Sequence, residues 1–328
     1  MAGQLHTRRT ALWSVAAALA CGRVGAAGTA PMPRIGLLSG AGFPELELAF
    51  VDELRKLGLI EDRDFALERR FAHHDTPEVK QMGAQLAQSR VSLVVASSLP
   101  LAIAVREANP QMPMIVGTCP GMVSNGFAQS LDKPGGIYTG IDELPPGVTA
   151  RRLRLLKAAA PEVTRVALLS TTPGHGGHEI QVSDAECAAR ELGIEVKAYR
   201  ASSLSGLHAS LEAIRADGMN GLQNFQGVLS LINRQLIVDL AQKYRVPAVY
   251  PIRVFATDGG LMVYGIDIVD QFQRAASYVD RILRGERAGD LPVQMPTKFR
   301  FVINLKTARA IGITVPPMLL AGADEVIE

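Results

Sequence analysis

Small hydroxyl, amide and glycine residues follow the apolar runs of this sequence, and the chemistry they offer is hydrogen bonding. In the stretch VVASSLPLAIAV, Ser97 and Ser98 stand between the end of a buried strand and the start of a helix. Similar residues follow other apolar runs, while paired acids, lysines and histidines do not, so this pattern favours binding over catalysis. The candidate binding residues are Ser39, Gly40, Ser97, Ser98, Thr118, Thr171, Thr172, Gln226, Tyr250 and Tyr264.

Two interpretations of Ser97 and Ser98 stay open at this point. Either serine can cap the helix that follows, an effect of about 1 kcal/mol. Alternatively, one serine caps while the other faces a cleft and donates a hydrogen bond to an anionic group of a ligand. The repetition of such residues at six strand ends favours the second interpretation.

Short apolar runs alternate with helical patterns along the chain. Such alternation predicts parallel strands with helices on both faces of each sheet. Ligands of parallel sheets bind outside the carboxyl ends of the strands, where helix N-termini expose free N–H groups. The expected strands are 34–40, 64–72, 91–96, 112–118, 163–170, 194–200, 219–225 and 246–250. The expected helices include 44–58, 77–89, 149–159, 177–192, 204–216, 230–244 and 268–285.

The length of 328 residues exceeds what one core usually organises, so we expect two lobes of similar architecture. The 48% hydrophobic and 20% charged residues are typical of a soluble globular protein. Beyond residue 30, no stretch reaches the roughly 18 uninterrupted apolar residues of a membrane span.

Residues 1–30 have the pattern of an export signal, which predicts a periplasmic protein. Arg8 and Arg9 precede an apolar run over 11–20, and small residues follow at 25–30. The arginine pair resembles a twin-arginine signal, although general secretory export stays open. We do not expect lipid anchoring at Cys21, because Ala18 stands where a leucine is normally needed.

Removal of this segment leaves a nearly neutral protein. The whole chain has a net charge of +2, and the segment holds three arginines and no acid, so the remainder has a charge of −1. A nearly neutral surface has no general attraction for phosphate backbones, so nucleic acid is not an expected partner. Cys119 and Cys187 then remain, and we interpret both as ordinary small apolar residues and not as a disulfide framework.

Several phrases resemble the substrate-binding proteins of ABC transporters, in the group that includes aromatic-amino-acid binders. These phrases are RIGLLSG at the first strand, SLDKPGGIYTGI at 130–141, the stretch 244–267 and the long C-terminal stretch 274–328. The resemblance runs from about residue 33 to the C-terminus. It implies a type I periplasmic-binding fold, in which two Rossmann-like lobes close on a solute.

The resemblance also implies three segments that cross between the lobes. By analogy these are GGIYTGI, GGLMVYGID and LPVQMPTKFRFVI, and their glycines at 135, 136, 259 and 260 suit a hinge. The implied division is 31–140 with about 264–288 for the first lobe, and 141–263 with about 289–328 for the second. The implied partners are a small solute, an ABC permease and its ATPase, with the binding protein itself a monomer.

The sequence departs from the family pattern at the expected cleft. Thr118-Cys119-Pro120 stands where relatives commonly have Gly-Asp-Pro, so an acid that could hold a ligand ammonium is missing there. STTPGHGGH at 170–178 and FQG at 225–227 replace phrases with Asn-Pro and Asp-Pro. The ligand can therefore differ from the amino acids of the family, and an amino-acid-like or carboxylate solute is expected.

Other classes of function have less support. HGGH at 175–178 resembles an oxyanion-hole loop, but no G-x-S-x-G elbow accompanies it, so we do not expect an enzyme. His175 and His178 could hold a metal with 73–75 of the other lobe, but exposed loop histidines explain them more simply. No dinucleotide fingerprint follows a strand, so no cofactor is expected. A sensor that reports a solute to a membrane receptor is the alternative to import.

Overall fold

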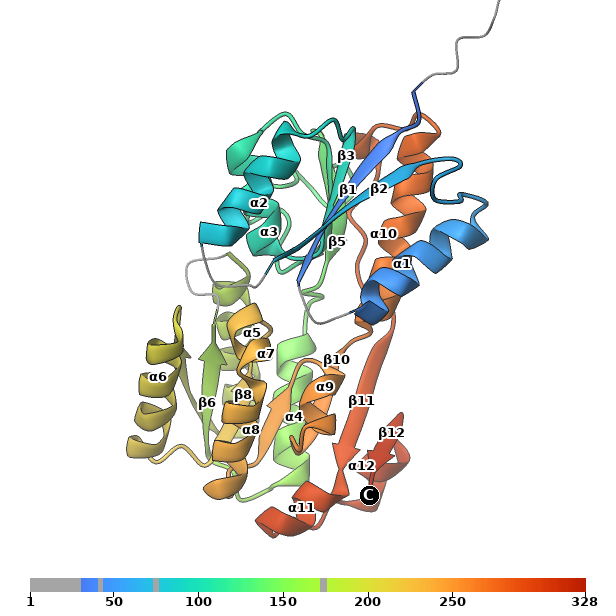
Figure 1. The fold of residues 1–328 in the computed structure, drawn as a ribbon. Coiled ribbons are helices and arrows are strands. Elements are labelled where there is room, and N and C mark those ends of the chain that lie inside the picture. The colour runs from blue at the N-terminus through green and yellow to red at the C-terminus, as the bar shows by residue number, and fades with distance from the viewer. Residues whose placement is uncertain (1–30, 41–43, 73–76, 172–175) are drawn as a thin grey trace, which may run out of the picture. The chain divides into compact units, whose positions relative to one another are not determined.

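The computed structural model describes residues 31–40, 44–72, 77–171 and 176–328. The predicted export segment therefore lies outside the described residues. Within them, the strands form one sheet of five strands and one of seven, with helices on both faces of each (Figure 1). This confirms the two-lobe α/β architecture predicted from the alternation.

The first sheet has the strand order β2-β1-β3-β4-β5, and all its neighbouring strands are parallel. Its central strands are short apolar runs because helices cover both of their faces, and all four residues of β3 are buried. Its strands are β1 (Arg34–Gly40), β2 (Ala66–Ala72), β3 (Leu93–Ala96), β4 (Met114–Cys119) and β5 (Tyr138–Asp142).

Four helices enclose this sheet. Helices α2 (Pro77–Gln88) and α3 (Leu99–Ala108) pack on one face, and α1 (Pro44–Lys56) and α10 (Ile268–Leu283) pack on the other. Helix α10 comes late in the chain and returns to the first sheet, as expected. Its buried stripe includes Phe272, whereas Val269 is 38% exposed. The stripe begins instead at Ile268, four residues before Phe272.

The second sheet has the strand order β12-β11-β10-β9-β8-β6-β7. Helices α4, α5 and α12 pack on one face of it, and α6, α8 and α9 on the other. Its strands are β6 (Arg165–Ser170), β7 (Glu195–Arg200), β8 (Gly221–Asn224), β9 (Ala248–Tyr250), β10 (Met262–Ile266), β11 (Phe299–Asn304) and β12 (Glu325–Ile327). Its helices are α4 (Val148–Ala159), α5 (Gly176–Leu192), α6 (Leu204–Ala216), α7 (Val228–Ile232), α8 (Arg234–Lys243), α9 (Arg253–Thr257), α11 (Leu305–Ile311) and α12 (Pro317–Ala321).

Two features of this sheet differ from the prediction. The single helix expected over 230–244 is two helices, because Asn233 leaves helical geometry between α7 and α8, with φ −99° and ψ 24°. The strands are also not all parallel, since β10 and β11 run antiparallel. The chain leaves the sheet for the first lobe at the end of β10 and returns from that lobe at the start of β11. The two strands therefore run in opposite directions.

The described chain passes between the two sheets after β5, after β10 and after α10. The connecting residues are 143–147, Asp267 and 284–298, and the last segment includes a short 3₁₀ helix, η1 (Ala288–Asp290). The glycines predicted as hinges precede β5 and β10, so they lie at the amino ends of these strands and not in the connections. The lobe boundaries given above stay a prediction.

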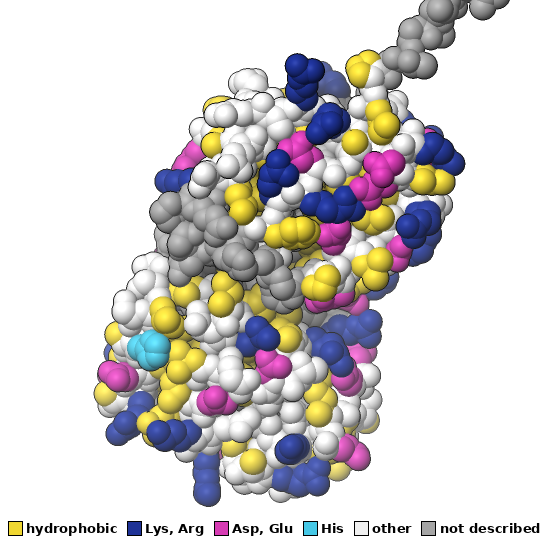
Figure 2. Space-filling model, viewed as in Figure 1, with side chains coloured by type: hydrophobic (Ala, Val, Ile, Leu, Met, Phe, Trp, Pro, Cys, Tyr) yellow, Lys and Arg dark blue, Asp and Glu magenta, His cyan; other side chains and the backbone are white. Residues whose placement is uncertain are grey.

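The surface carries no large field of one sign on the face that Figure 2 shows, where basic and acidic side chains are interspersed. In the described part of the chain, no helix combines the length and apolar character that crossing a membrane requires.

Cys119 is buried in β4, whereas Cys187 is exposed on α5, and neither forms a disulfide. Cys187 therefore lies on the surface of α5 and not in the core.

Candidate functional site

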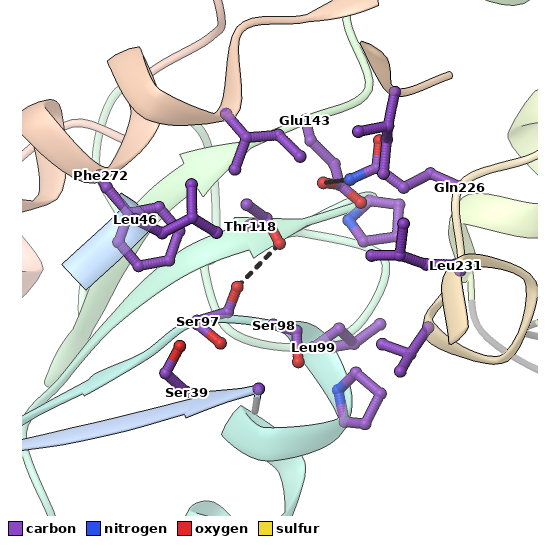
Figure 3. Close-up of a pocket in the computed structure, with 17 residues that line it drawn as sticks. Ser39, Leu46, Ser97, Ser98, Leu99, Thr118, Glu143, Gln226, Leu231 and Phe272 are labelled. Carbon is purple, nitrogen blue, oxygen red and sulfur yellow. Dashed lines mark hydrogen bonds between the residues drawn. The ribbon is translucent and has the colours of Figure 1, made fainter. Parts of the chain in front are cut away.

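A pocket with a cavity volume of about 90 Å³ lies where the carboxyl ends of strands from both sheets meet (Figure 3). Six of the predicted residues line it, from the first sheet and from the loop after β8 of the second. They are Ser39, Gly40, Ser97, Ser98, Thr118 and Gln226. The remaining lining residues that the structure describes are Leu46, Leu99, Pro100, Pro120, Glu143, Gly227, Val228, Leu231, Ile252, Ile268 and Phe272.

The hydroxyl residues of the first sheet meet because their strands are neighbours. Strands β1, β3 and β4 are adjacent and parallel, so Ser39, Ser97 and Thr118 emerge at the same edge. The Thr118 hydroxyl donates to the Ser97 carbonyl over 2.9 Å, which fixes the end of β4 against the end of β3. These residues form one polar wall of the pocket.

Ser98 occupies the N-cap position of α3, but its side chain does not cap the helix. Its backbone is extended, with φ −152° and ψ 162°, and no cap hydrogen bond forms. The Ser98 Oγ atom is buried, and it has no hydrogen-bond partner among the described residues. Capping therefore does not account for Ser98, and its position in the pocket wall favours the alternative of a ligand contact.

Glu143 is a lining residue that the sequence analysis missed. It directly follows β5, in the first connection between the sheets, and it is 9% exposed. The Gln226 side-chain amide donates to its Oε2 atom over 2.5 Å, and Figure 3 shows the two side chains meeting in the pocket. Burial, reinforced by the nearby Asp142, raises the pKa of Glu143 to about 8, while Thr118 and Arg152 act in the opposite direction.

Asp142 organises the backbone beside the pocket. Its carboxylate accepts from the backbone N–H groups of Gly121 at 3.0 Å, Met122 at 2.9 Å and Leu144 at 3.1 Å. Burial raises the pKa of Asp142, and these three hydrogen bonds act in the opposite direction. The acid thus holds both the turn after β4 and the start of the first connection.

Arg152, on α4, is a buried cation of the second lobe, and its positive charge acts to lower the pKa of Glu143. Its Nε atom donates to the Tyr264 carbonyl over 2.6 Å, and burial lowers the pKa of its guanidinium to about 10. It does not line the pocket. Glu143 is therefore the ionisable side chain of the pocket wall, as far as the structure describes that wall.

Three predicted residues lie away from the pocket. Thr171 accepts a hydrogen bond from the Ser230 N–H over 3.3 Å. Tyr250 is fully buried against Phe255, with ring centroids 4.8 Å apart, because its side chain points to the α6 and α8 face of the sheet. Tyr264 stacks on Phe299 with centroids 5.6 Å apart. Thr172 lies outside the described residues.

The histidines suggested as metal ligands are only partly described. Residues 73–75 and His175 lie outside the described residues. His178 is buried in the first turn of α5 and lies edge-on to Phe225, so it is not the exposed loop residue that we expected. The described residues hold no cluster of three or more His, Cys, Asp or Glu side chains with the geometry of a metal site.

Some of the lining residues that we did not predict have a clear signal in the sequence, and others do not. The rule that located Thr118 also applies to Glu143, because this residue follows the strand at the edge of the same sheet. Leu46 and Phe272 come from α1 and α10, where a helical apolar stripe indicates burial but does not separate core from pocket. Arg253, at the start of α9, pairs with Glu325 over 2.6 Å and does not line the pocket.

Comparison with known proteins identifies the family of this chain. Residues 36–327 match the family described as ABC transporter substrate binding protein. The chain belongs to this family. Members of this family are substrate-binding components of ABC transporters.

Individual relatives of this ABC substrate-binding protein are distant in sequence. The tyrosine-binding protein of Clostridioides difficile is 22% identical over 273 residues, which are 82% of this chain and 78% of that protein. An ABC domain from Streptococcus pneumoniae in complex with L-Trp is 23% identical, with a TM-score of 0.82 over 90% of this chain and 99% of that one. A ligand-free, open substrate-binding protein with adhesive properties from Clostridium difficile has a TM-score of 0.67 at 20% identity, with the same coverage. These structures confirm the predicted fold.

Proposed function

We propose that this protein is the extracytoplasmic solute-binding component of an ABC importer and that it captures a small solute between its two lobes. The observation that carries this proposal is the pocket itself, because its walls come from both sheets. Ser97 belongs to the first sheet and Gln226 to the second. A solute in contact with both would stabilise the closed arrangement of the lobes over the open one.

The proposed ligand is an amino-acid-like or carboxylate solute with an apolar body. Leu46, Leu231 and Phe272 offer an apolar wall, and the serine hydroxyls and the N-terminus of α3 offer donors to a carboxylate. Micromolar capture needs about 8 kcal/mol. Three or four charge-assisted hydrogen bonds of about 1.5 to 3 kcal/mol each supply this, offset in part by ordering costs.

Contacts between the lobes support closure. The Gln226 amide of the second lobe reaches the Glu143 carboxylate in the first connection. Gly177, at the start of α5, lies against Pro120, which follows β4 of the first sheet. Both contacts join segments that would move relative to each other if the lobes rotate about their connections.

The export signal predicted at residues 1–30 supports a periplasmic location. We propose that the protein acts there as a monomer and delivers its solute to an ABC permease coupled to an ATPase.

A thermal-unfolding screen tests the function. Purified protein is heated alone and with each of the twenty amino acids and a set of small carboxylic acids. We expect at least one compound to raise Tm in a concentration-dependent way, because a ligand that binds only the folded state stabilises it by mass action. Mass spectrometry of any compound that copurifies with the protein identifies further candidates. Turnover of a bound compound would contradict the proposal.

A further inference from the structure

Glu143 is a buried acid with an unusual position in the pocket. It lines the cavity at 9% exposure, and one of its carboxylate oxygens accepts from Gln226, which follows β8 of the second sheet. Figure 3 shows its carboxylate beside Thr118 and Gln226, among side chains that are mostly apolar. A carboxylate in such surroundings needs either a cation or a proton to offset its charge.

The charged and titratable groups that face Glu143 do not supply this cation. Asp142, the preceding residue, carries the same charge as ionised Glu143. Burial raises the pKa of the Cys119 thiol on β4, and the two acids raise it further, so this thiol is no cation either. Arg152, from α4, attracts Glu143 only through its charge, and its Nε atom donates a hydrogen bond to the Tyr264 carbonyl instead.

The described pocket wall also contains no lysine, arginine or histidine. An ionised Glu143 in the empty pocket would therefore lack a neutralising contact among the described residues. The raised pKa of this carboxyl, about 8, agrees with that arrangement and means that most molecules hold a proton there at pH 7.

We propose that Glu143 is the specificity-determining residue for a solute that carries an ammonium group, and that the ammonium binds in exchange for the Glu143 proton. The carboxylic acid loses its proton to the solvent, and the remaining carboxylate accepts hydrogen bonds from the ammonium while Gln226 retains its own. This inference rests on the proposed function. It adds to that function the ammonium as the group of the solute that the pocket recognises, and the release of the Glu143 proton on binding.

The exchange makes binding depend on pH. Below the pKa of about 8, the ionised fraction of Glu143 falls about tenfold for each pH unit, and the apparent affinity for an ammonium solute falls with it. A solute that presents a carboxylate at this point would have the opposite effect. It would accept a hydrogen bond from the protonated acid, retain the proton and bind more tightly at lower pH.

Isothermal titration calorimetry with three related probes tests the inference. L-tyrosine carries both groups, tyramine lacks the carboxylate, and 3-(4-hydroxyphenyl)propionate lacks the ammonium. Titration of each probe in phosphate and in Tris at pH 7 gives the number of protons exchanged, because the two buffers differ in ionisation enthalpy. We expect L-tyrosine and tyramine to bind with release of most of one proton, because the pKa of about 8 lies above the pH of the titration. We expect 3-(4-hydroxyphenyl)propionate to bind at least tenfold more weakly than L-tyrosine.

Glu143→Gln is the matched variant, because its amide oxygen can still accept from Gln226. We expect it to lose at least tenfold in L-tyrosine affinity at pH 7 and to release no proton. The wild-type affinity should rise about tenfold from pH 6 to pH 7, while that of the variant stays constant. Glu212→Gln, at an exposed position on α6, should behave as wild type.

The outcomes separate this inference from the proposed function. L-tyrosine binding with no proton exchange, or with proton uptake, overturns the role of Glu143 and leaves solute capture intact. Tighter binding of the propionate than of tyramine overturns it as well. Absence of binding by all three probes contradicts the proposed amino-acid-like or carboxylate ligand and this inference together.

Discussion

Among the single residues of the pocket, Ser97 and Ser98 carry the clearest contrast between a structural and a binding role. The Ser97 carbonyl is held by Thr118, while the Ser98 hydroxyl forms no cap bond. We expect the double substitution Ser97→Ala and Ser98→Ala to weaken solute binding at least tenfold and to leave Tm without solute nearly unchanged. Calorimetric titration and thermal unfolding measure the two quantities.

Ser203 provides the matched control. Its side chain accepts from the Gly206 N–H over 3.1 Å and so caps α6. Ser203→Ala should lower the unfolding free energy by about 1 kcal/mol and leave solute affinity unchanged. Unchanged affinity in the Ser97 and Ser98 double variant would remove both serines from the site.

The raised pKa of Glu143 also predicts a dependence of stability on pH. Its pKa moves from 4.5 to about 8 on folding. Between these pH values the folded protein holds a proton that the unfolded chain has lost, so this residue lowers stability as pH rises. Without solute, Glu143→Gln should match the wild type in Tm near pH 5 and exceed it near pH 8.5. A constant Tm difference across this range would contradict the raised pKa.

At the residue scale, a rule about strand ends predicts which side chains of the first sheet lie at one edge. It located Ser39, Ser97 and Thr118, because the ends of adjacent parallel strands share an edge. It did not place Tyr250 correctly in the pocket wall, since side chains alternate between the faces of a strand and β9 is only three residues long. The face of so short a strand depends on packing against α6 and α8, which the sequence does not show.

At the scale of elements, the start of α5 lies directly against the turn after β4. A Cβ atom on Gly177 would lie 2.4 Å from the Pro120 carbonyl oxygen, which is shorter than real contacts allow. The turn resists displacement, because the Asp142 carboxylate accepts hydrogen bonds from the N–H groups of Gly121 and Met122. A side chain at residue 177 would therefore keep the lobes apart.

Gly177→Ala should accordingly weaken solute binding at least tenfold. It should not lower the stability of the solute-free protein, because alanine has the higher helix propensity. Gly322→Ala is the control, since its Cβ atom would meet its nearest neighbour at 3.5 Å, an ordinary contact. Equal affinities of the two variants would show that the lobes do not close through the α5 contact.

The alternation of strands and helices predicted most elements to within a few residues, and α6 has the bounds expected for it. The antiparallel direction of β11 could not be predicted in this way, because it depends on the lobe from which the chain arrives. The break between α7 and α8 was also missed. Asn233 is compatible with a helix in sequence terms, and its departure from helical geometry depends on the surroundings.

At the scale of the whole molecule, solute binding should make the protein more compact. If the two lobes close on the solute, the radius of gyration from small-angle X-ray scattering should fall when a solute from the thermal screen is added. Gly177→Ala should keep the larger value at the same solute concentration. An unchanged radius for the wild type at saturation would argue for a rigid pocket and against closure.

The central claim is that solute binds unchanged between the carboxyl ends of two sheets, and a crystal structure of the protein with its bound solute tests it most directly. The account predicts density for an intact solute in contact with Ser97 of the first sheet and Gln226 of the second, with Glu143 at hydrogen-bond distance. Density at any other place on the molecule, or a solute chemically altered in the pocket, would contradict it.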